Sequence, residues 1–308
     1  MNTKTYLSMH IPGFFERWKR YKRGVKGKNL KEWCISSDYV NDKKKPNCVA
    51  TFTIFPKSLI PQIIREIREN APTDIKNMTQ VSPKTSDYIK NSPYFFSISV
   101  IIKNKKLLCN PDLLKSIETI IKTYNNFNEE KSLFREKYKK IQKFNQYMKQ
   151  NHCSKETIGL LLYVAKFVSY ICEFLLIKEN NKIVHWFSDR DSIVEFSDKI
   201  IYDFIVSYTE SLVHTRISDY NISAPIVNTE EHQKEYDTLI RIPDIISGVL
   251  SSLHPKGNNL AYEKVKHRDI FLNSILSNEK IVIIDVEIQK NNLQNVREIM
   301  YFKPDEVS

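Results

Sequence analysis

The first third of the chain alternates between segments with the hydrophobic pattern of strands and one with the pattern of a helix. Residues 31–40 and 48–56 are rich in β-branched and aromatic residues and are separated by the turn-like sequence DKKKPN, which predicts a hairpin. Residues 94–104 (YFFSISVIIKN) predict a third strand. Between them, isoleucines recur every three or four positions in residues 58–70, which predicts an amphipathic helix.

The remainder of the chain mixes helical and strand-like patterns. Helices are predicted at 111–124, 129–149, 157–177, 191–208 and 235–253. Strands are predicted at 182–187, 210–218, 223–229, 280–288 and 297–302. Three early strands followed by helices alternating with strands indicate an α/β fold with a mixed sheet flanked by helices. The sequence has no internal repeat and no linker, so a single domain is expected over residues 1–308, with a basic leader (1–31), a helical insertion (105–180) and a C-terminal strand extension (254–308).

The predicted helix at 157–177 is apolar and long enough to raise the question of a membrane span. Lys166, Ser169 and Glu173 follow one another at helical spacing and form a polar stripe along it. Two opposite charges near the middle of a bilayer are expensive, so we expect a buried central helix and no membrane partner.

The composition indicates which cellular compartment and which class of binding partner to expect. The chain has 308 residues, is 41% hydrophobic and carries a formal net charge of +11, which favours polyanionic partners such as nucleic acid. A general bias toward Lys, Asn and Ile would produce much of the same charge. The five cysteines are scattered without a CxxC pair, which points to a reducing, cytoplasmic location and away from a disulfide framework or a structural zinc site.

Acidic residues follow two of the predicted strands and recur in a late helix. Asp38 comes at the end of the first strand, Asp189 follows "VHWFS", and Asp244 lies in the helix predicted at 235–253. Carboxylates that converge from distant segments can bind a hard cation such as Mg²⁺ or Mn²⁺, and such cations stabilise the reacting oxygens of a phosphodiester. Asp191 is a further candidate ligand and Asp237 a reserve one.

These motifs resemble the RNase-H-like family catalogued as domain of unknown function 3800. The segment Ile242–Gly248 (IPDIISG) is similar to the motif in that family's last helix, and Asp189 matches its mid-chain acid at a strand end. The opening motif departs from the family, because "SSDYVND" has neither a Glu after Asp38 nor a glycine. In an alternative alignment, Asp38 lies two positions past the family's first acid, and Ser36 stands at that place. The resemblance implies an RNase-H-like fold, catalytic residues Asp38, Asp189 and Asp244, Mg or Mn as cofactor, and a nuclease with a possible role in bacterial defence.

Each acidic residue also has a structural interpretation. Asp38 is followed by Asn41 and Asp42, which is typical of a turn. Asp189 and Asp191 are suited to cap a helix that starts near residue 192. Asp244 lies among isoleucines, so it needs a partner, which a cation or an arginine would provide. A non-catalytic module that binds nucleic acid or a partner protein is therefore the alternative to a nuclease.

The segment 14–31 carries clustered basic residues with interleaved aromatics. Basic groups neutralise phosphates and aromatic rings stack on unpaired bases, so this segment is a candidate nucleic-acid surface. The predicted contacts are Arg17, Trp18, Lys19, Arg20, Lys22 and Arg23. The aromatic residues also recur at helical spacing, which favours packing of the same helix on the domain.

Overall fold

The computed structural model describes most of the chain. The described residues are 4–25, 30–103, 139–144, 146, 154–189, 195, 199–217, 219–223, 230–256, 259–288 and 294–298. The predicted helix at 111–124 and most of that at 129–149 lie outside them, as do Arg190 and Asp191.

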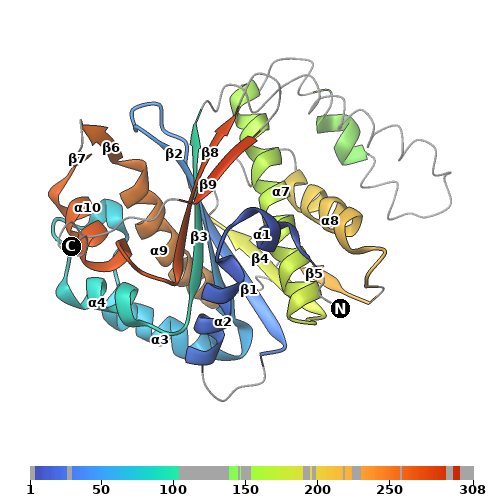
Figure 1. The fold of residues 1–308 in the computed structure, drawn as a ribbon, viewed down its shortest axis with the longest axis horizontal. Helices are drawn as coiled ribbons and strands as arrows, with labels where there is room; N and C mark the ends of the chain where they lie inside the picture. The colour runs from blue at the N-terminus through green and yellow to red at the C-terminus, as the bar shows by residue number, and fades with distance from the viewer. Residues whose placement is uncertain are drawn as a thin grey trace.

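The molecule is an α/β protein built on a mixed sheet of seven strands (Figure 1). Its strands are β1 (Glu32–Val40), β2 (Cys48–Pro56), β3 (Phe96–Lys103), β4 (Ile183–Ser188), β5 (Asn221–Ser223), β8 (Ile281–Ile288) and β9 (Gln294–Glu298). They are ordered β5-β4-β1-β2-β3-β8-β9. A separate hairpin is formed by β6 (Leu253–Lys256) and β7 (Asn259–Tyr262).

The first two strands form the hairpin that the sequence predicts, and β3 pairs antiparallel with β2, which makes a three-stranded meander. The strand β4 then lies parallel to the outer side of β1, and β5 lies parallel to β4. From the other end of the chain, β8 pairs parallel with β3. The C-terminal segment is therefore a part of the central sheet and not an appendage to it.

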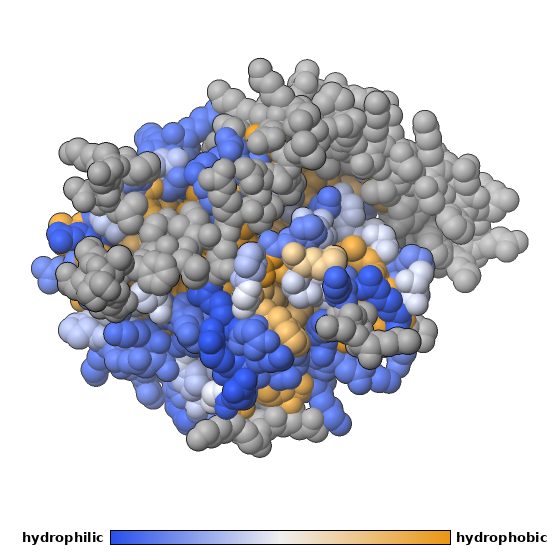
Figure 2. Space-filling model, in the orientation of Figure 1, coloured by the Kyte–Doolittle hydropathy of each residue, from blue (hydrophilic) through white to orange (hydrophobic). Residues whose placement is uncertain are grey.

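Helices cover both faces of this sheet (Figure 1). One face is covered by α1 (Tyr6–His10), α2 (Phe14–Gly24), α7 (Lys155–Lys178) and α8 (Ile200–Val213). The other is covered by α3 (Ile60–Asn70), α4 (Pro83–Asn91), α9 (Glu230–Ser251), α10 (Val265–Ile270) and the short turns η1 (Lys57–Leu59), η2 (Ile75–Asn77) and η4 (Phe271–Ile275). On the side of the molecule shown in Figure 2, hydrophilic side chains cover the region of α3 and α4, and apolar side chains are visible near the middle.

Strand alternation assigns the residues of β1 to the two faces. Trp33 contacts Trp18 of α2, and Tyr39 contacts Phe52, which stacks on Phe167 of α7. The odd-numbered residues of β1 thus face α2 and α7, and the even-numbered ones face α9.

The apolar helix α7 is the buried central helix expected from the sequence. Its length and composition would allow it to cross a membrane, but 83% of its most apolar stretch is buried inside the protein. Ser169 donates to the carbonyls of Ala165 and Ile205, and Glu173 accepts from the Tyr6 amide and from Arg216. The polar stripe therefore connects α7 to α8 and to the N-terminal segment.

One prediction in the middle of the chain is wrong. Residues 210–213, expected in a strand, are the end of α8, whose buried positions recur at helical spacing from Ile200 to Val213. The helix expected at 191–208 is confirmed over residues 200–208, where it forms the first part of α8, and most of residues 190–198 lie outside the described residues. The hairpin β6–β7 and the helices α4 and α10 were not predicted, because each is short and lacks a sustained period.

Candidate acidic site under helix α9

The face of the sheet under α9 is unusually polar. Its central hydroxyl groups are all fully buried and come from β1, β2 and β3: Ser36, Thr51, Thr53, Ser97 and Ser99. Thr51 pairs with Ser99 at 3.0 Å and Thr53 with Ser97 at 2.9 Å between hydroxyl oxygens. Because these two pairs of hydroxyl groups are hydrogen-bonded, they can be buried under α9. The helix therefore packs partly on polar side chains of the sheet.

Ser36 has a structural partner in α9. Pro243 lies inside this helix and has no N–H to donate to the carbonyl of Leu239, four residues earlier. The Ser36 hydroxyl approaches that carbonyl at 3.4 Å and donates to it. Ser36 thus compensates for the proline of the IPDIISG motif.

Asp38 belongs to the strand and not to a turn, which corrects one interpretation of the sequence. It pairs with Thr51 in the sheet, its side chain is buried, and one carboxylate oxygen accepts from the Ser247 hydroxyl of α9. Burial, followed by the nearby charge of Asp244, raises the pKa of Asp38 to about 7, and Asp189 adds to the effect. Close to neutral pH this carboxyl is therefore divided between its acid and its anion.

Asp244 holds the turn η2 against α9. Its carboxylate accepts from the Ile75 amide at 3.3 Å. One turn further along the helix, Gly248 leaves room for the Ile75 side chain, since a Cβ there would lie 2.9 Å from Ile75 Cγ2. Burial raises the pKa of Asp244 to about 6; Lys76 opposes this shift, whereas Asp74 and Asp189 increase it. The Asp and the Gly of the motif therefore act together in docking η2.

Asp189 directly follows β4 and is tied to β1. Its amide donates to the Ser37 carbonyl at 3.3 Å, which extends the parallel pairing of the two strands by one residue. The N-cap of α8 is Lys199, so Asp189 does not cap that helix. Its position at the strand end is the one expected from the sequence.

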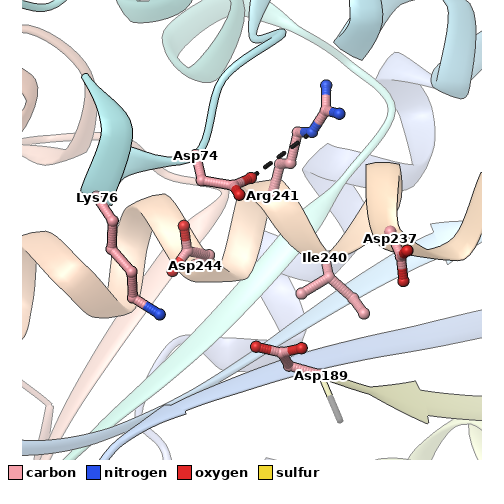
Figure 3. A pocket seen from close by; sticks show the side chains of 7 residues that line it. All are labelled: Asp74, Lys76, Asp189, Asp237, Ile240, Arg241 and Asp244. Atoms are coloured by element: carbon pink, nitrogen blue, oxygen red, sulfur yellow. Dashed lines mark ion pairs between the residues drawn. The ribbon is translucent and has the colours of Figure 1, made fainter. Parts of the chain in front are cut away.

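Asp189 and Asp244 line one pocket of about 330 Å³ beside α9 (Figure 3). The described lining residues are Asp74, Lys76, Asp189, Asp237, Ile240, Arg241 and Asp244. Arg241 pairs with Asp74 at 3.8 Å, and in Figure 3 the Lys76 side chain runs alongside Asp244 and ends below it, to the left of Asp189. Asp38 is not among the described lining residues, but the charges of Asp189 and Asp244 raise its pKa.

The carboxylates of the pocket are ligands of the type that a hard cation prefers, but they do not form a complete coordination shell. Among the described residues, no three His, Cys, Asp or Glu side chains are grouped closely enough to hold a metal ion. Mg²⁺ commonly takes only one or two carboxylates and completes its shell with water and phosphate oxygens. Asp189 and Asp244, which line the pocket, therefore fit such an ion by number and type of ligand.

Two residues at the pocket carried no signal in the sequence. Asp74 and Lys76 flank Ile75 in and beside η2, within a stretch that shows neither helical nor strand periodicity. Their relevance depends on the docking of η2 on α9, which joins positions about 170 residues apart. These two residues could have been identified only from a sequence signal for the contact between η2 and α9.

The basic helix α2 lies on the opposite face of the sheet from the pocket. Trp18 is fully buried, so its ring is not available for stacking on a base. Its position matches the interpretation that this helix packs on the domain. Arg17 donates to the carbonyls of residues 278, 279 and 281, Arg20 pairs with Glu279, and Lys22 pairs with Glu179. Much of the basic charge of α2 thus anchors the helix to the domain.

Comparisons of the chain with protein-family models, with curated proteins and with solved structures found no match to any of the three.

Proposed function

We propose that this chain is an RNase-H-like, divalent-cation-dependent nuclease whose active site is the pocket beside α9. The observation that carries the proposal is the convergence of Asp38, Asp189 and Asp244 from three distant segments. Perturbed carboxyl pKa values around one pocket are typical of functional sites. The acid that follows strand β4 and the acid on the late helix α9 occur in the order of the motifs on which the resemblance rests.

In this proposal Asp189 and Asp244 hold Mg²⁺ or Mn²⁺, which supplies Lewis acidity toward a phosphate oxygen. Asp244, with a pKa of about 6, is mostly ionised at neutral pH and is thus in the form that binds a cation. Arg241 and Lys76 supply positive charge at the same pocket, which offsets part of the repulsion between its carboxylates and an anionic substrate. Asp38 orients α9 through Ser247 and adds negative charge near the pocket.

A non-catalytic module that binds nucleic acid or a partner protein is the second candidate. It is favoured by the hydrogen bond that occupies Asp38 and by the lack of a three-ligand group among the described residues. The net charge of +11 would serve either function. The two candidates differ in whether a divalent cation is bound and used.

The test compares Asp189→Asn and Asp244→Asn with the wild type in Mn²⁺-dependent cleavage of single- and double-stranded DNA and RNA. Asn keeps the shape of Asp but removes the charge that a hard cation requires, so we expect each variant to lose activity by about a hundredfold or more. Asp87→Asn, on the exposed surface of α4, is the matched control and should keep wild-type activity.

Binding and cleavage distinguish the candidates. If the wild type neither cleaves any of these substrates nor gains thermal stability from Mn²⁺, the module replaces the nuclease. If Asp189→Asn keeps full activity, the chain is an enzyme but the acidic pocket is not its active site.

A further inference from the structure

The pocket contains a cation of its own, the ammonium group of Lys76. Its side chain lines the pocket together with Asp189 and Asp244, and in Figure 3 it runs alongside Asp244. Its charge also lowers the pKa of Asp244 and that of Asp38, which come from α9 and β1. Arg241, the second cation among the described lining residues, pairs with Asp74 and donates to the Ala71 carbonyl. Lys76 is therefore the lining cation that acts on the deeper carboxylates.

The backbone that carries Lys76 is clamped on two sides. On one side, the Ile75 amide donates to Asp244, and the Ile75 side chain packs in the space that Gly248 leaves. On the other side, the buried ammonium of Lys266 donates to the carbonyls of Ile75 and Met78. Fixed in this way, η2 presents Lys76 to the pocket while the side chain itself stays exposed.

The net charge of the lining residues favours the binding of a cation. Among the described lining residues, four carboxylates stand against Lys76 and Arg241, which is a formal charge of −2. Like charges held close together and partly buried repel one another, and any cation that enters relieves this repulsion. In the absence of an added ion, Lys76 provides part of that relief.

We propose that Lys76 is a built-in counter-ion of the acidic pocket that opposes the binding of a divalent cation at Asp189 and Asp244. This rests on the proposed function, because it assumes that the pocket takes a cation. The pocket then holds a bare divalent ion weakly, and an ion that arrives with a phosphate, whose charge Lys76 attracts, is favoured over the ion alone.

The experiment measures Mn²⁺ affinity by calorimetry and by the electron paramagnetic resonance signal of free Mn²⁺. Lys76→Met removes the charge from an exposed position, so the fold should be retained. We expect it to bind Mn²⁺ about tenfold more tightly than the wild type, as the loss of one neighbouring positive charge predicts. Lys76→Arg should keep wild-type affinity, and so should Lys84→Met, which removes an exposed lysine of α4 as the matched control.

The outcomes separate this inference from the function on which it rests. Tighter binding by Lys76→Met alone supports the counter-ion. Equal, measurable binding by Lys76→Met and the wild type overturns the counter-ion and leaves the cation site standing. If neither binds Mn²⁺ at millimolar concentration, the cation site fails and the counter-ion fails with it.

Discussion

Replacing Trp18 with Ala is expected to lower the free energy of unfolding by about 3–5 kcal/mol, the range typical of a buried aromatic side chain. Trp18 is fully buried where α2 meets the sheet, with ring centroids 5.1 Å from Trp33, 5.3 Å from Phe96 and 5.3 Å from Phe174. Its indole N–H also donates to Glu179 at 2.9 Å. The substitution removes this packing and leaves a carboxylate with one partner fewer.

Urea unfolding followed by circular dichroism measures this loss, and Arg23→Ala on the exposed side of α2 is the control, with little change expected. The same pair decides between the two interpretations of the basic segment. If Trp18 stacked on bases, its replacement would weaken nucleic-acid binding while stability stayed near that of the wild type. That result would contradict the packing seen here.

The core of the fold was predictable because its strands are apolar and bounded by turn residues. The segments 31–40, 48–56 and 94–104 became β1, β2 and β3 with boundaries shifted by at most two residues. Prediction of secondary structure failed where an element is short or where its apolar residues fit both the helical and the strand period. Residues 210–213 are an example, because nothing local distinguishes the end of a buried helix from a short strand.

The candidate site was predictable in part for a similar reason. Asp189 was identifiable as a strand-end acid, and Asp244 by its isoleucine neighbours, since both signals are local. The roles of Ser36 and Lys76 were not, because each depends on a contact between distant segments. Ser36 meets a carbonyl freed by Pro243, and Lys76 reaches the pocket only because η2 docks on Asp244 and Gly248.

The second large effect is expected for Asp38→Asn, which should raise stability at pH 8. The pKa of Asp38 is about 7 in the folded protein, well above its ordinary value of 3.8. Between about pH 4 and pH 7 the unfolded chain has therefore released this proton while the folded chain still holds it. The wild type should lose stability as the pH rises through this window and should level off above pH 7.

Asn cannot ionise, so the variant lacks this contribution and keeps a side chain that can bond to Ser247. A pKa difference of about three units corresponds to up to about 4 kcal/mol, and we expect a gain of that order at pH 8 and almost none at pH 4. Part of the slope should persist between about pH 4 and pH 6, because the raised pKa of Asp244 acts in the same direction.

Urea unfolding from pH 4 to pH 9 in the presence of a chelator measures both curves, with Asp87→Asn as the control that keeps the wild-type slope. The chelator matters, since a cation bound among these carboxylates would favour their ionised forms and flatten the wild-type curve. An Asp38→Asn variant that is less stable than the wild type at pH 8 would mean that the Asp38 anion is stabilised by groups around it. In that case the ionised Asp38 carboxylate helps to hold α9 on the sheet. Its burial then costs no stability, and a bound cation has no such cost to relieve.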